Sequence, residues 1–256
     1  MWETILLSFF AFLAGFVDSI VGGGGLIQLP ALLIWLPGAS AGAIAPIFGT
    51  NKFAAVFGTG SAAVQYTRKI QLGWEILLPG AVSAFIFSAL GAMAVSLLTV
   101  AMMKPAVVLA LAAVAVFTYT KKDFGRFANS PGFSKNKATL LAIVTGMVVG
   151  FYDGFFGPGT GSFLIFIFVA VFGFDFLRAS ASAKIINFAT NLSAVAYFTA
   201  TGNVMFQYAI PMAICQLAGG FLGSRLAILK GNHFIRRFFL AIVVILLIRL
   251  CYDLVA

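Results

Sequence analysis

Residues 15–25 read Gly-Phe-Val-Asp-Ser-Ile-Val-Gly-Gly-Gly-Gly, and residues 150–161 read Gly-Phe-Tyr-Asp-Gly-Phe-Phe-Gly-Pro-Gly-Thr-Gly. Each stretch places an aspartate, Asp18 or Asp153, and a cluster of glycines inside a long apolar segment. Glycine and proline interrupt helices and expose backbone N–H and C=O groups. In a bilayer, such backbone is tolerated only where protein buries it or where it lines a polar cavity. The two matched interruptions therefore predict one site that is built from two halves.

The composition indicates an all-α integral membrane protein. Of 256 residues, 62% are hydrophobic and only 9% are charged, whereas soluble domains carry about 25% charged residues. The net charge of +9 does not indicate a nucleic-acid partner, because membrane proteins collect Lys and Arg in their cytoplasmic loops. Cys215 and Cys251 lack the spacing of metal ligands and are interpreted as packing residues. We expect no metal and no cofactor.

The apolar segments divide the chain into two membrane repeats, residues 1–120 and 138–256, joined by a basic linker over 121–137. Its lysines and arginine predict a cytoplasmic location for the linker. The predicted segments are 4–21, 25–36, 41–66, 74–98 and 105–120 in the first repeat, and 138–156, 161–173, 179–200, 204–228 and 234–252 in the second.

The repeats match at a nearly constant offset and are predicted to have inverted topology. Asp18 and Asp153 lie 135 positions apart, and Lys52 and Lys184 lie 132 apart. The positive-inside rule is satisfied best if 138–173 forms a hairpin that returns to the side it entered. Each repeat is then a Gly-broken hairpin plus three transmembrane helices, in opposite orientations. Repeats of this kind in transporters surround a shared site near the midplane.

A helix that restarts after a glycine break presents free N–H groups and the positive end of its dipole, which favours an anion. Two such restarts are expected to bind substrate. A phosphate-binding nucleotide loop is not indicated, because no Lys-Ser/Thr follows the glycines. The alternative is that the glycines only permit close helix packing. The predicted ligands are Gly22, Gly23, Gly24, Gly25, Gly157, Gly159, Thr160 and Gly161.

Lysines at equivalent positions of the two repeats, Lys52 and Lys184, are the next candidates. A lysine within a membrane segment costs about 2.5–3.5 kcal/mol on insertion scales and usually faces a cavity or a partner. The alternative is that the side chain extends to the membrane interface. Neighbouring polar groups that can hydrogen-bond a ligand are Asn51, Asn187 and Asn191, together with Thr59.

Three hypotheses remain open for Asp18 and Asp153. Each carboxylate could cap the helix that follows it. Alternatively, Asp18 and Asp153 could form ion pairs with Lys184 and Lys52 respectively, or crosswise. They could also carry a coupling proton if burial disfavours their charged form.

The two glycine motifs, together with Thr50-Asn51-Lys52, resemble the sulfite exporter TauE/SafE family, also called the YfcA-like or toluene-sulfonate-uptake permease family. The resemblance covers nearly the whole chain. It implies a multi-pass transporter of the bacterial inner membrane for sulfite, sulfonates or related sulfur-containing organic anions, and it leaves a homodimer open. Because Ala183 stands in the second repeat where Asn51 stands in the first, a strictly two-fold ligand shell is not expected.

Transport of a small sulfur oxyanion, with export as the expected direction, is thus the first hypothesis. A competing hypothesis is an integral-membrane enzyme that acts on a lipid or isoprenoid phosphate. Against it, the single histidine, His233, lies in a basic loop, and no acid–base constellation is evident. A third hypothesis is transport of a different small anion, such as a carboxylate.

Overall fold

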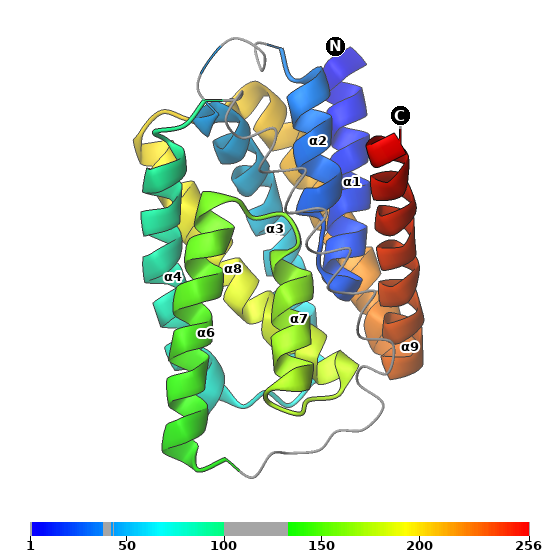
Figure 1. Ribbon diagram of the computed structural model, residues 1–256. Coiled ribbons are helices and arrows are strands. Elements are labelled where there is room, and N and C mark those ends of the chain that lie inside the picture. The colour runs from blue at the N-terminus through cyan, green and yellow to red at the C-terminus, as the bar shows by residue number, and fades with distance from the viewer. Residues whose placement is uncertain (1, 38–41, 43, 100–132, 256) are drawn as a thin grey trace.

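The computed structural model describes residues 2–37, 42, 44–99 and 133–255, and within these ranges the chain is a bundle of helices without a sheet (Figure 1). The predicted helix over 105–120 and residues 121–132 of the predicted linker lie outside them. The helices are α1 (Trp2–Val21), α2 (Gly25–Trp35), α3 (Ala45–Lys69), α4 (Trp74–Val95), α6 (Lys135–Phe155), α7 (Thr160–Ala170), α8 (Phe176–Ala200) and α9 (Phe206–Val255). Helix α6 already begins at Lys135, inside the range predicted as linker.

Among the described helices, α1, α4, α6 and the part of α9 from Phe206 to Ile235 are long and apolar enough to cross a membrane. This confirms the predicted class of all-α integral membrane protein. Helices α3 and α8 are 25 residues long but more polar, because α3 contributes Lys52 and Asn51 to the interior, and α8 contributes Lys184, Asn187 and Asn191. Helices α2 and α7 have 11 residues each and, at about 1.5 Å per residue, are too short to cross.

The short helices belong to two hairpins, α1–α2 and α6–α7, whose tips are the glycine interruptions. In Figure 1, the first hairpin extends from the end of the bundle that holds the N-terminus, and the second extends from the opposite end. Helices α3 and α8 pack against each other and against the hairpins. Both tips therefore lie at the middle of the bundle, beside the most polar helices.

Small residues bring the outer helices close together. Gly146, Gly150 and Gly154 recur at every fourth position of α6 and thus occupy one face of it. A side-chain carbon added at Gly150 would lie 2.5 Å from the backbone oxygen of Ala84 in α4. Helix α9 packs against α1 in the same way through Gly219. Such small-residue contacts are typical of helix association in membranes.

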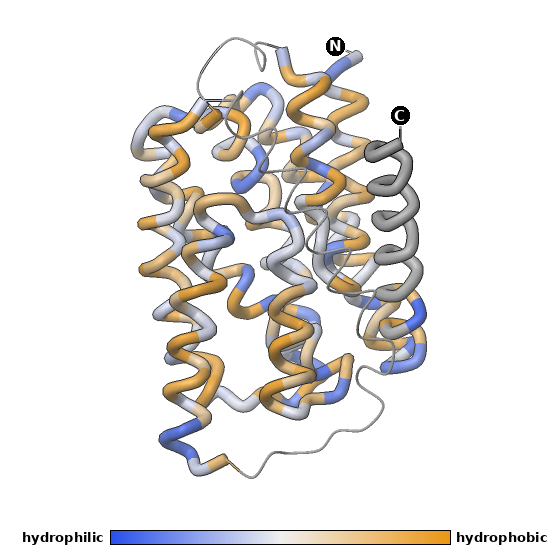
Figure 2. Tube along the Cα trace, viewed as in Figure 1, coloured by the Kyte–Doolittle hydropathy of each residue, from blue (hydrophilic) through white to orange (hydrophobic). Residues whose placement is uncertain are grey.

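The outer surface and the two ends of the bundle differ in polarity. Apolar side chains such as Ile5, Leu78, Val148 and Ile214 are exposed on the outside, as expected for a surface that faces a lipid bilayer. At the end opposite the N-terminus, hydrophilic residues gather (Figure 2). Basic residues near the helix ends there include Arg68, Lys69, Lys135, Lys137, Arg178, Lys230 and Arg237.

The close approach of α4 and α6 can be tested with Gly150→Ala. The added carbon would overlap the Ala84 backbone, so the helices have to separate. We expect a loss of stability of about 1–3 kcal/mol, measured as a lower thermal midpoint in detergent. Gly42→Ala is the control, because within the described part of the chain, apart from the residues next to Gly42 in sequence, no atom lies within 4 Å of the added carbon. Equal midpoints for both variants would contradict the proposed packing.

Candidate functional site

The tips of the two hairpins touch. A side-chain carbon added at Gly161 would lie 2.6 Å from Cα of Gly22, and the Ser162 hydroxyl donates a hydrogen bond to the Val21 carbonyl at 3.1 Å. Gly22 has φ of +77°, a left-handed conformation that side chains other than glycine rarely adopt. The two interruptions, far apart in sequence, thus meet at one place.

The last carbonyls of α1 would lack partners inside their own helix. Each accepts a hydrogen bond from a different neighbouring helix, namely Ser19 from the Tyr66 hydroxyl at 2.8 Å, Ile20 from Ser180 at 2.9 Å and Val21 from Ser162 at 3.1 Å. The end of α1 is therefore fixed to α3, α8 and α7, which places the first glycine cluster accurately.

Two buried ion pairs connect each central helix to the hairpin of the other half of the chain. Lys184 Nζ of α8 lies 2.7 Å from Asp18 Oδ2, and Lys52 Nζ of α3 lies 2.7 Å from Asp153 Oδ2. The lysines are 0% and 2% exposed, so neither reaches the membrane interface. Of the hypotheses for the aspartates, ion pairing is the one observed for both.

Further hydrogen bonds organise the same groups. Asp18 Oδ1 also accepts from the backbone N–H of Gly24 at 3.2 Å, so this carboxylate caps the start of α2 as well. Lys52 donates to Asn191 Oδ1 at 3.1 Å, and Asn191 Nδ2 donates to Asn187 Oδ1 at 3.3 Å. The asparagines of α8 thus continue the polar network that begins at the Lys52 ion pair.

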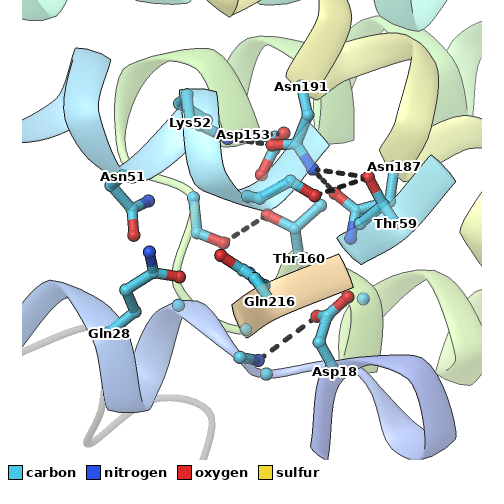
Figure 3. A pocket seen from close by; sticks show the side chains of 17 residues that line it. Asp18, Gln28, Asn51, Lys52, Thr59, Asp153, Thr160, Asn187, Asn191 and Gln216 are labelled. Carbon is cyan, nitrogen blue, oxygen red and sulfur yellow. Dashed lines mark hydrogen bonds and ion pairs between the residues drawn. The ribbon is translucent and has the colours of Figure 1, made fainter. Parts of the chain in front are cut away.

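A small polar cavity of about 30 Å³ lies where the tips meet α3, α8 and α9 (Figure 3). A space of about 10–15 Å³ by this kind of measure holds one water molecule, so the cavity has room for roughly two. It is lined by Asp18, Gly23, Gly24, Gly25, Gln28, Asn51, Lys52, Ala55, Thr59, Asp153, Gly157, Gly159, Thr160, Gly161, Asn187, Asn191 and Gln216.

Most of the residues predicted from sequence line this cavity, but Gly22 and Lys184 do not. Gly22 is covered by its contact with the other tip. Lys184 lies behind the tip, 3.3 Å from where a side-chain carbon of Gly161 would stand, and binds Asp18. Its predicted role as a direct ligand therefore has no support in the geometry.

Sequence reasoning missed two amides in the lining, Gln28 and Gln216. Each is a single polar residue in an apolar stretch, Leu-Ile-Gln-Leu-Pro and Ile-Cys-Gln-Leu-Ala. Polar side chains within a membrane segment usually face a cavity or a partner, so both glutamines could have been predicted on the same ground as the lysines.

Three amides of the lining have unpaired atoms. Among the described residues, no hydrogen-bond partner exists for either amide atom of Gln28, for Asn51 Oδ1 or for Gln216 Oε1, although these residues are only 1%, 7% and 2% exposed. Gln28 and Asn51 point toward one another in Figure 3. A buried polar group without a partner costs about 1–3 kcal/mol. The unpaired amides therefore lower the stability of the folded protein, which indicates that they have a role in the function of the cavity.

The cavity can bind an oxyanion. Helices α2 and α7 both begin at its wall, and the first turn of a helix presents N–H groups and the positive end of the dipole. The unpaired amide donor of Gln28 borders the same space, whereas the Thr160 hydroxyl there already donates to the Gly157 carbonyl and Asn191 Nδ2 to Thr59 and Asn187. Within the described part of the chain, no three His, Cys, Asp or Glu side chains cluster in a way that could hold a metal ion.

The fold and cavity together define a polytopic helical membrane protein with an internal polar site. Residues 7–250 match the family model described as sulfite exporter TauE/SafE, and the chain belongs to this family. No solved structure matches the chain significantly.

Named relatives support the same class. The chain is 36% identical to "Probable membrane transporter protein ORF9" of Sinorhizobium sp over 95% of this chain and 90% of the relative. It is 34% identical to a probable membrane transporter protein of Haemophilus influenzae, over 94% and 92%. Identity to the probable membrane transporter protein YfcA of Escherichia coli K12 is 31%, over 97% and 89%. The chain is thus a membrane transporter and not an enzyme.

The ion pairs predict which second substitution restores the thermal stability that is lost when a lysine is replaced. Lys52→Met leaves the Asp153 carboxylate buried without its partner, which typically costs about 3–5 kcal/mol. Adding Asp153→Asn removes that charge, so we expect the double variant to regain most of the lost thermal stability in detergent.

The matched control combines Lys52→Met with Asp18→Asn. Asp18 pairs with Lys184 instead, so this combination should be less stable than Lys52→Met alone. If both combinations restored stability equally, the assignment of partners would be wrong.

Proposed function

We propose that the protein transports sulfite or a related small sulfur-containing organic anion through the cavity at the hairpin tips. The observation that carries this proposal is the buried, unpaired donor Nε2 of Gln28, which lies at a cavity bordered by two helix N-termini. An oxyanion offers several acceptor oxygens at once, and each amide N–H₂ group offers two donors. Binding of the anion would supply the acceptor that Gln28 Nε2 lacks, whereas the unpaired oxygens of Gln28, Asn51 and Gln216 need a donor, such as a protonated oxygen of the ligand or a water molecule.

The proposed binding set comprises the glycine backbones of both tips and the side chains around them. Gly23, Gly24 and Gly25 act with α2, and Gly157, Gly159, Thr160 and Gly161 act with α7. Asn51, Lys52, Asn187 and Asn191 complete the set, and Gln28 and Gln216 are added to it. Asp18 and Asp153 are assigned the structural role of holding the lysines and the tips.

The proposed mechanism is alternating access by an inverted repeat, each half a Gly-broken hairpin plus three transmembrane helices. The cavity of about 30 Å³ has room for roughly two water molecules, whereas a sulfur oxyanion has four or more heavy atoms, so the cavity has to widen to hold the substrate. The tips have to separate to admit substrate. Because the two hairpins extend from opposite ends of the bundle (Figure 1), movement of one or the other would open the site to one side of the membrane.

The proposed direction of transport follows from the charge of the anion and from the orientation of the protein in the membrane. We assign the end rich in Lys and Arg, with the linker, to the cytoplasmic side of the inner membrane, as the positive-inside rule requires. An inside-negative potential then favours exit of an anion by about 2.3 kcal/mol per charge per 100 mV. Export therefore needs no coupling ion, and Asp18 and Asp153 need not carry a proton.

Proteoliposomes loaded with sulfite test this proposal. With an imposed inside-negative potential and no pH gradient, we expect sulfite release that depends on the protein, because the potential alone drives an anion outward. Release is measured by a sulfite-specific assay, with a reversed potential as the control. Release that required a pH gradient would reject uniport, and release of a carboxylate but not of sulfite would reject the substrate.

Gln28→Leu separates binding from stability. Because both amide atoms of Gln28 are buried and unpaired, the apolar variant should keep or raise its thermal midpoint while sulfite transport falls by about tenfold, the effect of losing roughly 1.4 kcal/mol of binding energy. Thermal shift and flux are measured on the same preparations.

Ser182→Ala serves as the matched control. The Ser182 hydroxyl is also buried and unpaired, but Ser182 does not line the cavity. Its flux should equal that of the unmodified protein. Wild-type flux in Gln28→Leu would remove this amide from the site.

A further inference from the structure

The charges at the cavity sum to zero. Asp18, Lys52 and Asp153 line it, and Lys184 lies directly behind one tip, bound to Asp18. Each ammonium is 2.7 Å from one carboxylate, so neither lysine offers a whole unmatched charge to a ligand. No other Lys or Arg of the described residues lines the cavity.

The remaining positive potential comes from the two helix starts. The N-terminus of a helix is equivalent to roughly half an elementary charge, and α2 and α7, with 11 residues each, both begin at the cavity. Together these two ends supply about one positive charge at the cavity wall, because the C-terminal ends of α1 and α6 at the same tips, which carry the opposite partial charge, end at Val21 and Phe155 and do not line the cavity. The buried amides add hydrogen-bond donors but no net charge.

A second negative charge on the ligand would find no counterpart. The cavity wall instead includes the carboxylates Asp18 and Asp153, which are acceptor-only when ionised and repel an anion beside them. Desolvating a charge without a matching partner is costly in a closed cavity of about 30 Å³.

From this balance we propose that the site selects singly charged oxyanions, such as hydrogensulfite and sulfonates, over doubly charged ones, such as sulfate and the sulfite dianion. The selection is made by the pairing of each lysine with an aspartate, which makes Asp18 and Asp153 specificity-determining residues. This inference rests on the proposed function, since it concerns the anion carried by the same site.

Competition between two sulfur oxyanions of different charge tests the selection. In proteoliposomes, flux of labelled methanesulfonate is measured against unlabelled methanesulfonate or sulfate, at one pH and matched ionic strength. We expect sulfate to compete at least about tenfold more weakly. Equal competition by sulfate would overturn the inference but leave anion transport standing, whereas the absence of flux or binding for every anion would overturn both.

A pH series with sulfite as the competitor provides a second test on the unmodified protein. As pH rises through the second ionisation of sulfurous acid, hydrogensulfite becomes the dianion, and competition by a fixed total amount of sulfite should fall with the singly charged fraction. Methanesulfonate stays singly charged, so its own flux corrects for any effect of pH on the protein. Competition that stayed level or rose would contradict the inference.

Asp153→Asn tests the residue assignment. It leaves Lys52 without its carboxylate, so the cavity gains one positive charge, and we expect sulfate to improve about tenfold relative to methanesulfonate. Adding Lys52→Met restores neutrality and should restore the exclusion of sulfate.

Glu75→Gln is the control for the same change of charge elsewhere. Glu75 is exposed, and its Oε2 lies 3.3 Å from Lys135 Nζ at the end of the bundle. The competition by sulfate relative to methanesulfonate should therefore not change in this variant. If Asp153→Asn does not fold, the two measurements on the unmodified protein still decide whether singly charged anions are selected. If Asp153→Asn folds and sulfate competes no better relative to methanesulfonate than before, Asp153 is not a specificity-determining residue.

Discussion

Two ion pairs, Lys52–Asp153 and Lys184–Asp18, determine how the halves of this protein fit together. Burying four charges within a membrane is costly, and the cost is offset only if each charge finds its partner at close range. Each partner belongs to the other half of the chain, so neither half can satisfy its own charges. The pairs therefore hold both hairpin tips against α3 and α8, and the remaining contacts of the site follow from that placement.

The tips can come so close because glycine leaves room for them. Backbone meets backbone at Gly22 and Gly161, and the carbonyls at the end of α1 are bound by side chains of three other helices. The outer helices approach each other through glycines in the same manner. Stability is thus supplied by packing and by the paired charges, which allows the amides of the cavity to stay unpaired.

Those unpaired amides connect the structure to transport. A cavity that encloses polar atoms without partners, among them the donor Gln28 Nε2, favours a state in which a ligand or water supplies those partners, and a cavity too small for the ligand requires the tips to move. Both requirements fit a transporter that closes around its substrate between two open states. In our proposal, the same neutral charge balance that lets the site be buried also limits the charge of the anion it can hold.

The sequence by itself determined the membrane class, the two glycine interruptions and the polar residues that the interior has to accommodate. These follow from local composition, because a bilayer leaves few ways to place a glycine cluster or a lysine within an apolar segment. The sequence also limited each aspartate to a short set of roles. It did not reveal Gln28 and Gln216, although each is an isolated amide in an apolar stretch.

Only the tertiary structure decided which lysine binds which aspartate, and that Lys184 lies behind the tip while Lys52 lines the cavity. Asp18 and Lys184 are 166 positions apart, and no local periodicity encodes a contact of that range. The same holds for Gln216, which reaches the site because α9 packs against α1 and α3. Residue types follow from the chemistry of the membrane, whereas their partners follow from how the helices pack in three dimensions.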